Sequence, residues 1–197
     1  MMTRPAVFLD KDGTLIENLP YNMELERVRL LPGVREGLQR FAQMDLAAVI
    51  VTNQPGMGAG LITEEEMDLV RQQMAELMAD CGLPLLGFYF CPHHFSLGET
   101  PCCSCRMPKP LLLQQAAEDL RIDLERSWMI GDILDDVEAG HRAGCRSILI
   151  SSGNEAVWDL SPIRLPDYMV GTMEEAAVIM EIMELADSRF EKHGRVR

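Results

Sequence analysis

The sequence has no apolar run of the roughly 20 residues that a membrane-spanning helix needs. Its N-terminus also lacks a basic segment followed by a long apolar stretch and a cleavage site. Positive charge is scarce, because 18 Lys and Arg stand against 31 Asp and Glu, for a net charge of −13. Nucleic acids and anionic membranes bind basic patches, so we expect neither as a partner and predict a cytoplasmic protein. A phosphate substrate is compatible with this charge, since helix N-termini, a bound cation and a few local basic residues can hold an anion.

Internal repeats, low-complexity tracts and linkers are also missing, and 197 residues that are 47% apolar can bury one core. We therefore predict one domain over residues 1–197 that acts as a monomer. Apolar runs predict buried strands at 5–9, 47–51, 86–90, 128–130 and 147–150. Amphipathic stretches predict helices at 32–44, 63–81, 110–120, 135–143 and about 173–187. This alternation predicts an α/β fold, a Rossmann-like parallel sheet with helices on both faces.

Polar residues end three of the predicted strands. Asp10, Thr52 and Asp132 each follow an apolar run, at the edge where open parallel sheets bind ligands. Asp10 and Asp12 lie two residues apart where the first strand breaks, so one carboxylate can act as nucleophile and the other as proton donor. Magnesium, held by carboxylate and carbonyl oxygens with Asp132 as a further ligand, would offset the charge at a phosphoryl group. A DxDG string alone is often only a turn or part of a calcium loop, but its place after a buried strand favours a catalytic site.

Four of the six cysteines lie within residues 91–105, with histidine among them. In a reducing compartment such clustering favours a metal over disulfides. The alternative is a group of reduced core cysteines beside a surface histidine.

Three segments resemble motifs of the haloacid dehalogenase (HAD) superfamily phosphatases: Asp-Lys-Asp-Gly-Thr-Leu at 10–15, Val-Thr-Asn-Gln at 51–54 and Gly-Asp-Ile-Leu-Asp-Asp at 131–136. Their order and separation over about residues 5–155 also fit, with no room for a large cap domain. The resemblance implies that Asp10 forms an aspartyl-phosphate and that Asp12 acts first as acid and then as base. It implies that Thr52 hydrogen-bonds the phosphoryl group. It also implies magnesium held by Asp10, the Asp12 carbonyl and Asp132, with Asp136 in support.

The cysteine segment resembles that of the zinc-loop branch of this superfamily, the heptose 1,7-bisphosphate 7-phosphatases and related histidinol-phosphate phosphatases. That branch carries C-x-H and then C-x-C before an Arg-Lys-Pro run. The pattern implies a closed, structural zinc site that positions Arg106, with four ligands: Cys91, His93, Cys103 and Cys105. His94 is an alternative to His93, and Cys102 is an alternative to Cys103.

Substrate selection then falls to short loops, and the residues we expect to contact substrate are Asn18, Tyr21, Asn53, Gln54, Arg106 and Lys109. The implied substrate is a small phosphorylated metabolite, with a heptose 1,7-bisphosphate first and histidinol phosphate or another sugar phosphate as alternatives.

Two departures from the branch keep a second class of function open. Met107 stands where the branch has lysine, and the loop after Gln54 lacks the arginine common in heptose-bisphosphate enzymes. Lys109, two residues on, has a flexible side chain that could replace the missing lysine unless the intervening proline prevents it. The alternative function is a non-catalytic phosphosugar-binding or regulatory protein. The glycine-rich segment 56–60 lacks the G-K-[ST] of a P-loop, so a nucleotide site is not expected. We expect His141 to be a surface residue.

Overall fold

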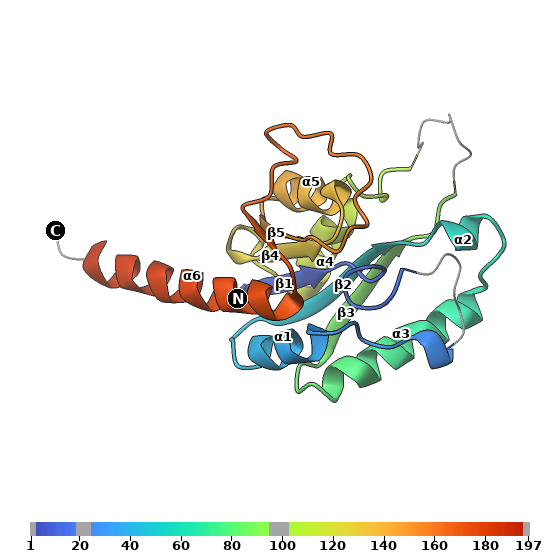
Figure 1. Cartoon of the computed structure of the whole chain (residues 1–197), viewed down its shortest axis with the longest axis horizontal. Coiled ribbons are helices and arrows are strands. Elements are labelled where there is room, and N and C mark those ends of the chain that lie inside the picture. Colours follow the sequence, from blue (N-terminus) through green and yellow to red (C-terminus); the bar gives the residue numbers. More distant parts are fainter. Residues whose placement is uncertain (1–2, 19–24, 95–102, 195–197) are drawn as a thin grey trace.

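The computed structural model of the chain describes residues 3–18, 25–94 and 103–194, with side chains through residue 187 (Figure 1). Six parallel strands form one sheet in the order β3-β2-β1-β4-β5-β6. Their bounds are Ala6–Leu9 (β1), Ala47–Asn53 (β2), Leu85–Cys91 (β3), Trp128–Gly131 (β4), Arg146–Ile150 (β5) and Tyr168–Val170 (β6). The predicted α/β parallel sheet is confirmed.

Helices cover both faces of the sheet. They are α1 (Val34–Phe41), α2 (Pro55–Gly58), α3 (Glu64–Ala79), α4 (Leu111–Leu120), α5 (Leu134–Ala143) and α6 (Met173–Gly194). Two single 3₁₀ turns span Leu25–Arg27 and Leu124–Arg126. Apolar residues of α1, α3 and α6 pack with Val7 and Leu9 on one face, and those of α4 and α5 pack with Ala6 and Phe8 on the other. All four residues of β1 are therefore buried, which explains why this strand is a continuous apolar run.

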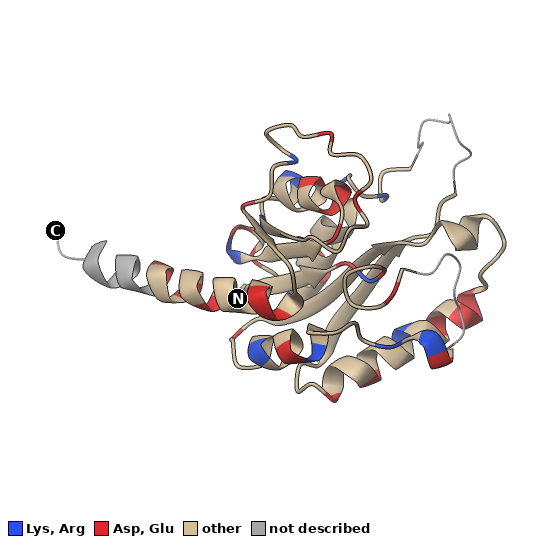
Figure 2. Cartoon of the chain, in the orientation of Figure 1, with Lys and Arg blue, Asp and Glu red and all other residues tan. Residues whose placement is uncertain are grey.

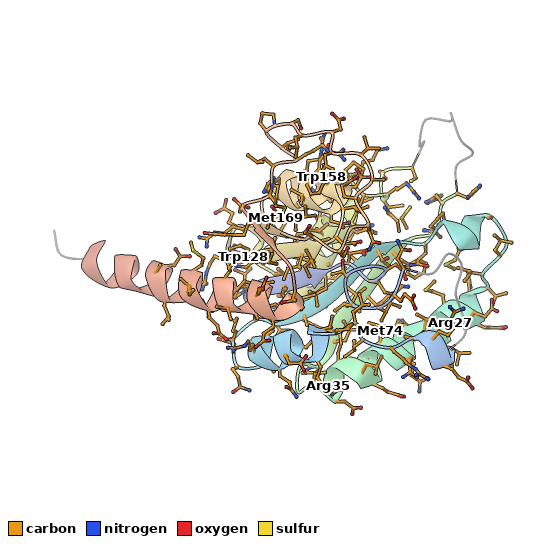
Figure 3. All side chains as sticks on the ribbon, in the orientation of Figure 1. Arg27, Arg35, Met74, Trp128, Trp158 and Met169 are labelled. Carbon is orange, nitrogen blue, oxygen red and sulfur yellow. The ribbon has the colours of Figure 1, made fainter. Side chains whose placement is uncertain are left out.

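Helix α3 begins as its sequence predicts. Thr63 Oγ1 accepts a hydrogen bond from the Glu66 amide at 3.2 Å, and Glu66 Oε2 accepts one from the Thr63 amide at 2.8 Å. The buried face of this helix includes Met74 (Figure 3). Trp128 of β4, also labelled there, is likewise buried. Acidic residues gather in the first turns of α3 and α6, where they complement the helix dipoles (Figure 2). Within the described ranges, no helix is long and apolar enough to cross a membrane.

Three features differ from the sequence prediction. Strand β6 has only three residues, too few for a clear periodic pattern, and it was not predicted. Helix α6 continues to Gly194 rather than ending near residue 187, and it extends away from the rest of the fold (Figure 1). The glycine-containing segment after β2 forms the short helix α2, at whose first position proline is favourable.

The loop from residue 151 to 167 runs over α5 and is fastened to it by side chains (Figure 1). His141 Nδ1 lies 2.8 Å from the Ile163 carbonyl oxygen, and its Nε2 lies 3.0 Å from Asp167 and 2.8 Å from Ser147 Oγ. Arg164 makes ion pairs of 3.0 Å with both Asp135 and Glu138. His141 is thus a partly exposed residue outside the cavity lining, and its ring also bonds the loop to α5 and β5.

Candidate active site and metal centre

A cavity of about 300 Å³ lies at the carboxyl ends of β1, β2 and β4. The predicted residues that line it are Asp10, Asp12, Asn18, Thr52, Asn53, Gln54, Arg106, Asp132 and Asp136. Parallel strands place their carboxyl ends at one edge, so three short sequence segments converge there. A larger groove of about 690 Å³ lies between α3 and β3, but none of the predicted site residues lines it.

Three carboxylates, Asp10, Asp132 and Asp136, form a buried cluster. Their exposed fractions are 7%, 3% and 1%, and one oxygen of each lies within 4.8 Å of the others. Burial, followed by the neighbouring charges of Asp136, Asp12 and Asp132, raises the pKa of Asp10 well above its usual range. Burial and the charge of Asp132 likewise raise the pKa of Asp136. Because close buried carboxylates repel one another and oxygen donors suit hard cations, this donor set fits magnesium.

Both oxygens of Asp132 have a donor. Thr14 Oγ1 donates to Oδ1 at 2.9 Å, and Asn154 Nδ2 donates to Oδ2 at 2.7 Å. Asp136 Oδ2 accepts from the backbone amides of Asp132 and Ile133, at 3.2 Å each, at the start of α5. Thr14 and Asn154 are not among the site residues that the sequence predicts. Thr14 sits inside the first motif, where it could have been noticed, whereas no pattern around Asn154 marks it.

Gly13 makes the turn between β1 and this cluster. Its φ of +91° is a left-handed conformation that side-chain-bearing residues rarely adopt. A Cβ at this position would lie 2.3 Å from Asp132 Oδ2 and 2.6 Å from Asn154 Nδ2. The glycine of the first motif therefore allows the turn to approach the Asp132 carboxylate.

Asp12 is held by two side chains. Lys11 Nζ lies 2.5 Å from Asp12 Oδ1, and Gln54 Nε2 donates to Asp12 Oδ2 at 2.7 Å. Gln54 also donates to Thr52 Oγ1 at 3.2 Å. Gln54, which we expected to contact substrate, thus links Asp12 to Thr52. Lys11 was not among the predicted site residues, although a basic residue between two motif carboxylates was a visible signal.

Asn53 connects β2 to the segment after the cysteines. Its side-chain amide donates to the Met107 carbonyl at 3.2 Å and accepts from the Met107 amide at 3.0 Å. Met107 is 2% exposed and lines the cavity beside Arg106. Lys109 is absent from the described cavity lining, because its exposed ammonium donates to the Cys103 carbonyl. The structure therefore does not bring Lys109 into the cavity as a substitute for the missing lysine.

The structure also brings Cys91, His93, Cys103 and Cys105 together, with one ligand atom of each within 4.8 Å of the others. Zinc bonds of about 2.3 Å to sulfur and 2.0 Å to nitrogen would place tetrahedral ligand atoms roughly 3.5–3.8 Å apart. Cys91 Sγ lies 3.7 Å from Cys103 Sγ and 3.5 Å from His93 Nδ1. The two separations that involve Cys105 are shorter, 3.1 Å to Cys91 and 3.2 Å to His93.

The chemistry of this ligand set, three cysteine sulfurs and one imidazole nitrogen, suits zinc. Burial, followed by hydrogen bonding with the Cys105 thiol, raises the pKa of Cys91 to about 12. A bound cation would favour the thiolates that metal binding requires. Tyr21, a predicted substrate contact, and Cys102, the alternative ligand, lie outside the described residues.

Known proteins resemble the chain in sequence and fold. The HAD-hydrolase-like family model matches residues 104–176. The D-glycero-beta-D-manno-heptose-1,7-bisphosphate 7-phosphatase of Yersinia pestis is 38% identical over 153 residues, covering 76% of this chain and 81% of that protein. The Escherichia coli K12 protein of the same name is 34% identical over 171 residues, which cover 81% of this chain and 90% of that protein. The D,D-heptose 1,7-bisphosphate phosphatase from B. bronchiseptica, solved with magnesium and phosphate, matches the fold with a TM-score of 0.77 at 24% identity. That match covers 91% of this chain and 99% of the other.

Proposed function

The chain belongs to the HAD phosphatase family that includes the D-glycero-β-D-manno-heptose 1,7-bisphosphate 7-phosphatases, and we propose that it removes the 7-phosphate from such a heptose bisphosphate. The observation that carries the proposal is the convergence of Asp10, Asp12, Thr52 and Asp132 in one cavity. The relatives supply the substrate class, and the geometry of this cavity supports the type of reaction. We also propose that residues 1–197 act as a single domain.

The proposed reaction has two steps. The Asp10 carboxylate attacks phosphorus, the bond from phosphorus to the sugar oxygen breaks, and Asp12 gives its proton to that leaving oxygen. The product on the protein is an aspartyl-phosphate at Asp10. The Asp12 carboxylate then takes a proton from water, the hydroxide attacks phosphorus, and inorganic phosphate leaves with Asp10 restored.

Other residues would bind the phosphoryl group and its counter-ion. Asp10, the Asp12 carbonyl and Asp132 would hold magnesium with support from Asp136, and the bound ion supplies positive charge near the phosphoryl oxygens. The Thr52 hydroxyl would donate to a phosphoryl oxygen. Thr14 and Asn154 keep the Asp132 carboxylate in place through the hydrogen bonds described above.

We also propose a structural zinc for the cysteine cluster of Cys91, His93, Cys103 and Cys105. Four protein ligands leave no open coordination position for a water nucleophile, so this metal would not take part in the reaction. Its effect would instead be to fix the segment that carries Arg106 and Met107 into the cavity wall.

One observation favours a second function. The apolar side chain of Met107 occupies a position in the cavity wall where the zinc-loop branch has lysine. Without that positive charge, the chain would bind a phosphosugar but not hydrolyse it. Phosphorus NMR of the heptose 1,7-bisphosphate reaction with magnesium separates the possibilities. Loss of the 7-phosphate resonance supports the proposal. Faster turnover of histidinol phosphate would redirect the substrate assignment, and binding without release of phosphate from any ester would support the binding protein.

A further inference from the structure

Lys11 is an unusual core residue. Its side chain is 2% exposed, and it ranks among the largest fully buried side chains of the described residues. Burying an ammonium costs several kcal/mol unless a charged partner offsets the loss of water. The charged partner of this ammonium is Asp12, whose Oδ1 lies 2.5 Å away. A methionine or leucine would fill the same space without that cost, so the position of the charge calls for an explanation.

Lys11 is one of the residues that line the active-site cavity. Of the cavity's described lining residues, five are carboxylates and two are basic, Lys11 and Arg106. Lys109 points toward the Cys103 carbonyl, and Met107 carries no charge. Lys11 is therefore the lysine whose ammonium reaches the Asp12 carboxylate.

Asp12 is fixed from two directions. Lys11 contacts one oxygen from the loop after β1, and Gln54 contacts the other from the end of β2. Two contacts on separate oxygens define the plane of a carboxyl group. Each oxygen offers two acceptor directions, so each keeps one for the leaving oxygen or for water. Gln54 is 4% exposed, so this side of the arrangement is also buried.

We propose that Lys11, together with Gln54, is a positioning residue that orients Asp12 for proton transfer. The inference rests on the proposed function, because it assumes that Asp12 protonates the leaving sugar oxygen. Positioned acid–base groups contribute about 10²–10⁴ to rate, and a displacement of about 1 Å can cost about a hundredfold. Removing the ammonium should therefore slow reactions that need the proton and spare those that do not.

The test compares two leaving groups. A sugar alkoxide needs a proton as it leaves, whereas p-nitrophenolate needs little help. The ratio kcat/KM reports only the steps through departure of this group. For Lys11→Met we expect kcat/KM to fall about a hundredfold on heptose 1,7-bisphosphate and by less than about threefold on p-nitrophenyl phosphate. Gln54→Leu should give the same split, and Lys11→Arg should recover part of the lost activity.

The matched control is Arg71→Met, which removes the cation of a 3.1 Å surface pair with Asp68 on α3. Both esters should react with Arg71→Met as with the wild type. Equal losses on the two esters, or no loss, for Lys11→Met would overturn the positioning role. If Lys11→Met does not fold by circular dichroism, Gln54→Leu decides by the same criterion. A wild type that hydrolyses neither ester would contradict the proposed function itself, and the inference with it.

Discussion

Cys105 offers a sharp test of the proposed zinc site, because it is close to two other ligands. Its sulfur lies 3.1 Å from Cys91 Sγ and 3.2 Å from His93 Nδ1, and the next residue in the chain is Arg106. Cys105→Ala leaves three ligands in an otherwise closed site. We expect the variant to lose its zinc and the cavity wall at Arg106 to lose its fixed position.

The size of the effect follows from linkage. A metal that binds only the folded chain at a free concentration 100 times its dissociation constant stabilises folding by about 2.7 kcal/mol. For a domain of this size, 1 kcal/mol shifts Tm by about 2–4 °C. Chelation of wild-type zinc under those conditions should therefore lower Tm by roughly 5–11 °C. Cys105→Ala should begin at the lower Tm and respond little to the chelator.

Zinc content by plasma mass spectrometry and thermal unfolding with and without chelator measure both quantities. Cys145→Ala is the matched control, because Cys145 is buried, 5% exposed, and lies outside the cysteine cluster. That variant should lose some packing energy but keep about one zinc per chain. A Cys105→Ala protein that retains its zinc, or a wild-type Tm indifferent to chelation, would refute the reasoning.

Three further changes test separate parts of the site. Met107→Lys adds an ammonium to the cavity and should raise kcat/KM for the sugar phosphate by on the order of tenfold; an unchanged ratio in steady-state assays would count against a charge deficit. Asn154→Ala frees one oxygen of Asp132 and should weaken magnesium binding, measured by titration calorimetry, by about 10–100-fold, and equal affinity would contradict this role. Burial favours a higher pKa for Asp167, but hydrogen bonds from His141 and the Ser147 amide hold it below its usual 3.8. The stabilising contribution of the Asp167 carboxylate is therefore complete above about pH 4 and is lost as pH falls through the lowered pKa. Asp167→Asn should lower the free energy of unfolding at neutral pH, measured by urea denaturation, and this loss should shrink toward about pH 2. A pH-independent deficit would contradict this assignment.

The sequence could predict the site wherever a residue's place follows from the end of a strand. Asp10, Thr52 and Asp132 meet because their strands are parallel neighbours, and each strand is a buried apolar run that is easy to recognise. The contacts of Lys11 and Asn154 could not be predicted in this way. They depend on where a flexible side chain ends and on how a long loop crosses α5, and neither is encoded in local periodicity.

Element ends show the same limit. Helix α4 ends at Leu120, and the next residue, Arg121, adopts a left-handed φ of 56° where glycine would be the usual signal. The sequence left open whether Lys109 replaces the lysine missing at Met107, and the structure directs its ammonium to the Cys103 carbonyl instead.

Phosphoryl transfer to Asp10 is tested most directly by trapping the acyl phosphate. The wild type is mixed with heptose 1,7-bisphosphate and magnesium, quenched in acid within the first turnover, and reduced with borohydride, which converts an aspartyl-phosphate to homoserine. Peptide mass spectrometry should find homoserine at position 10, and Asp10→Asn should show neither this product nor phosphate release. Release of phosphate by Asp10→Asn at the wild-type rate would contradict the assignment of Asp10 as nucleophile.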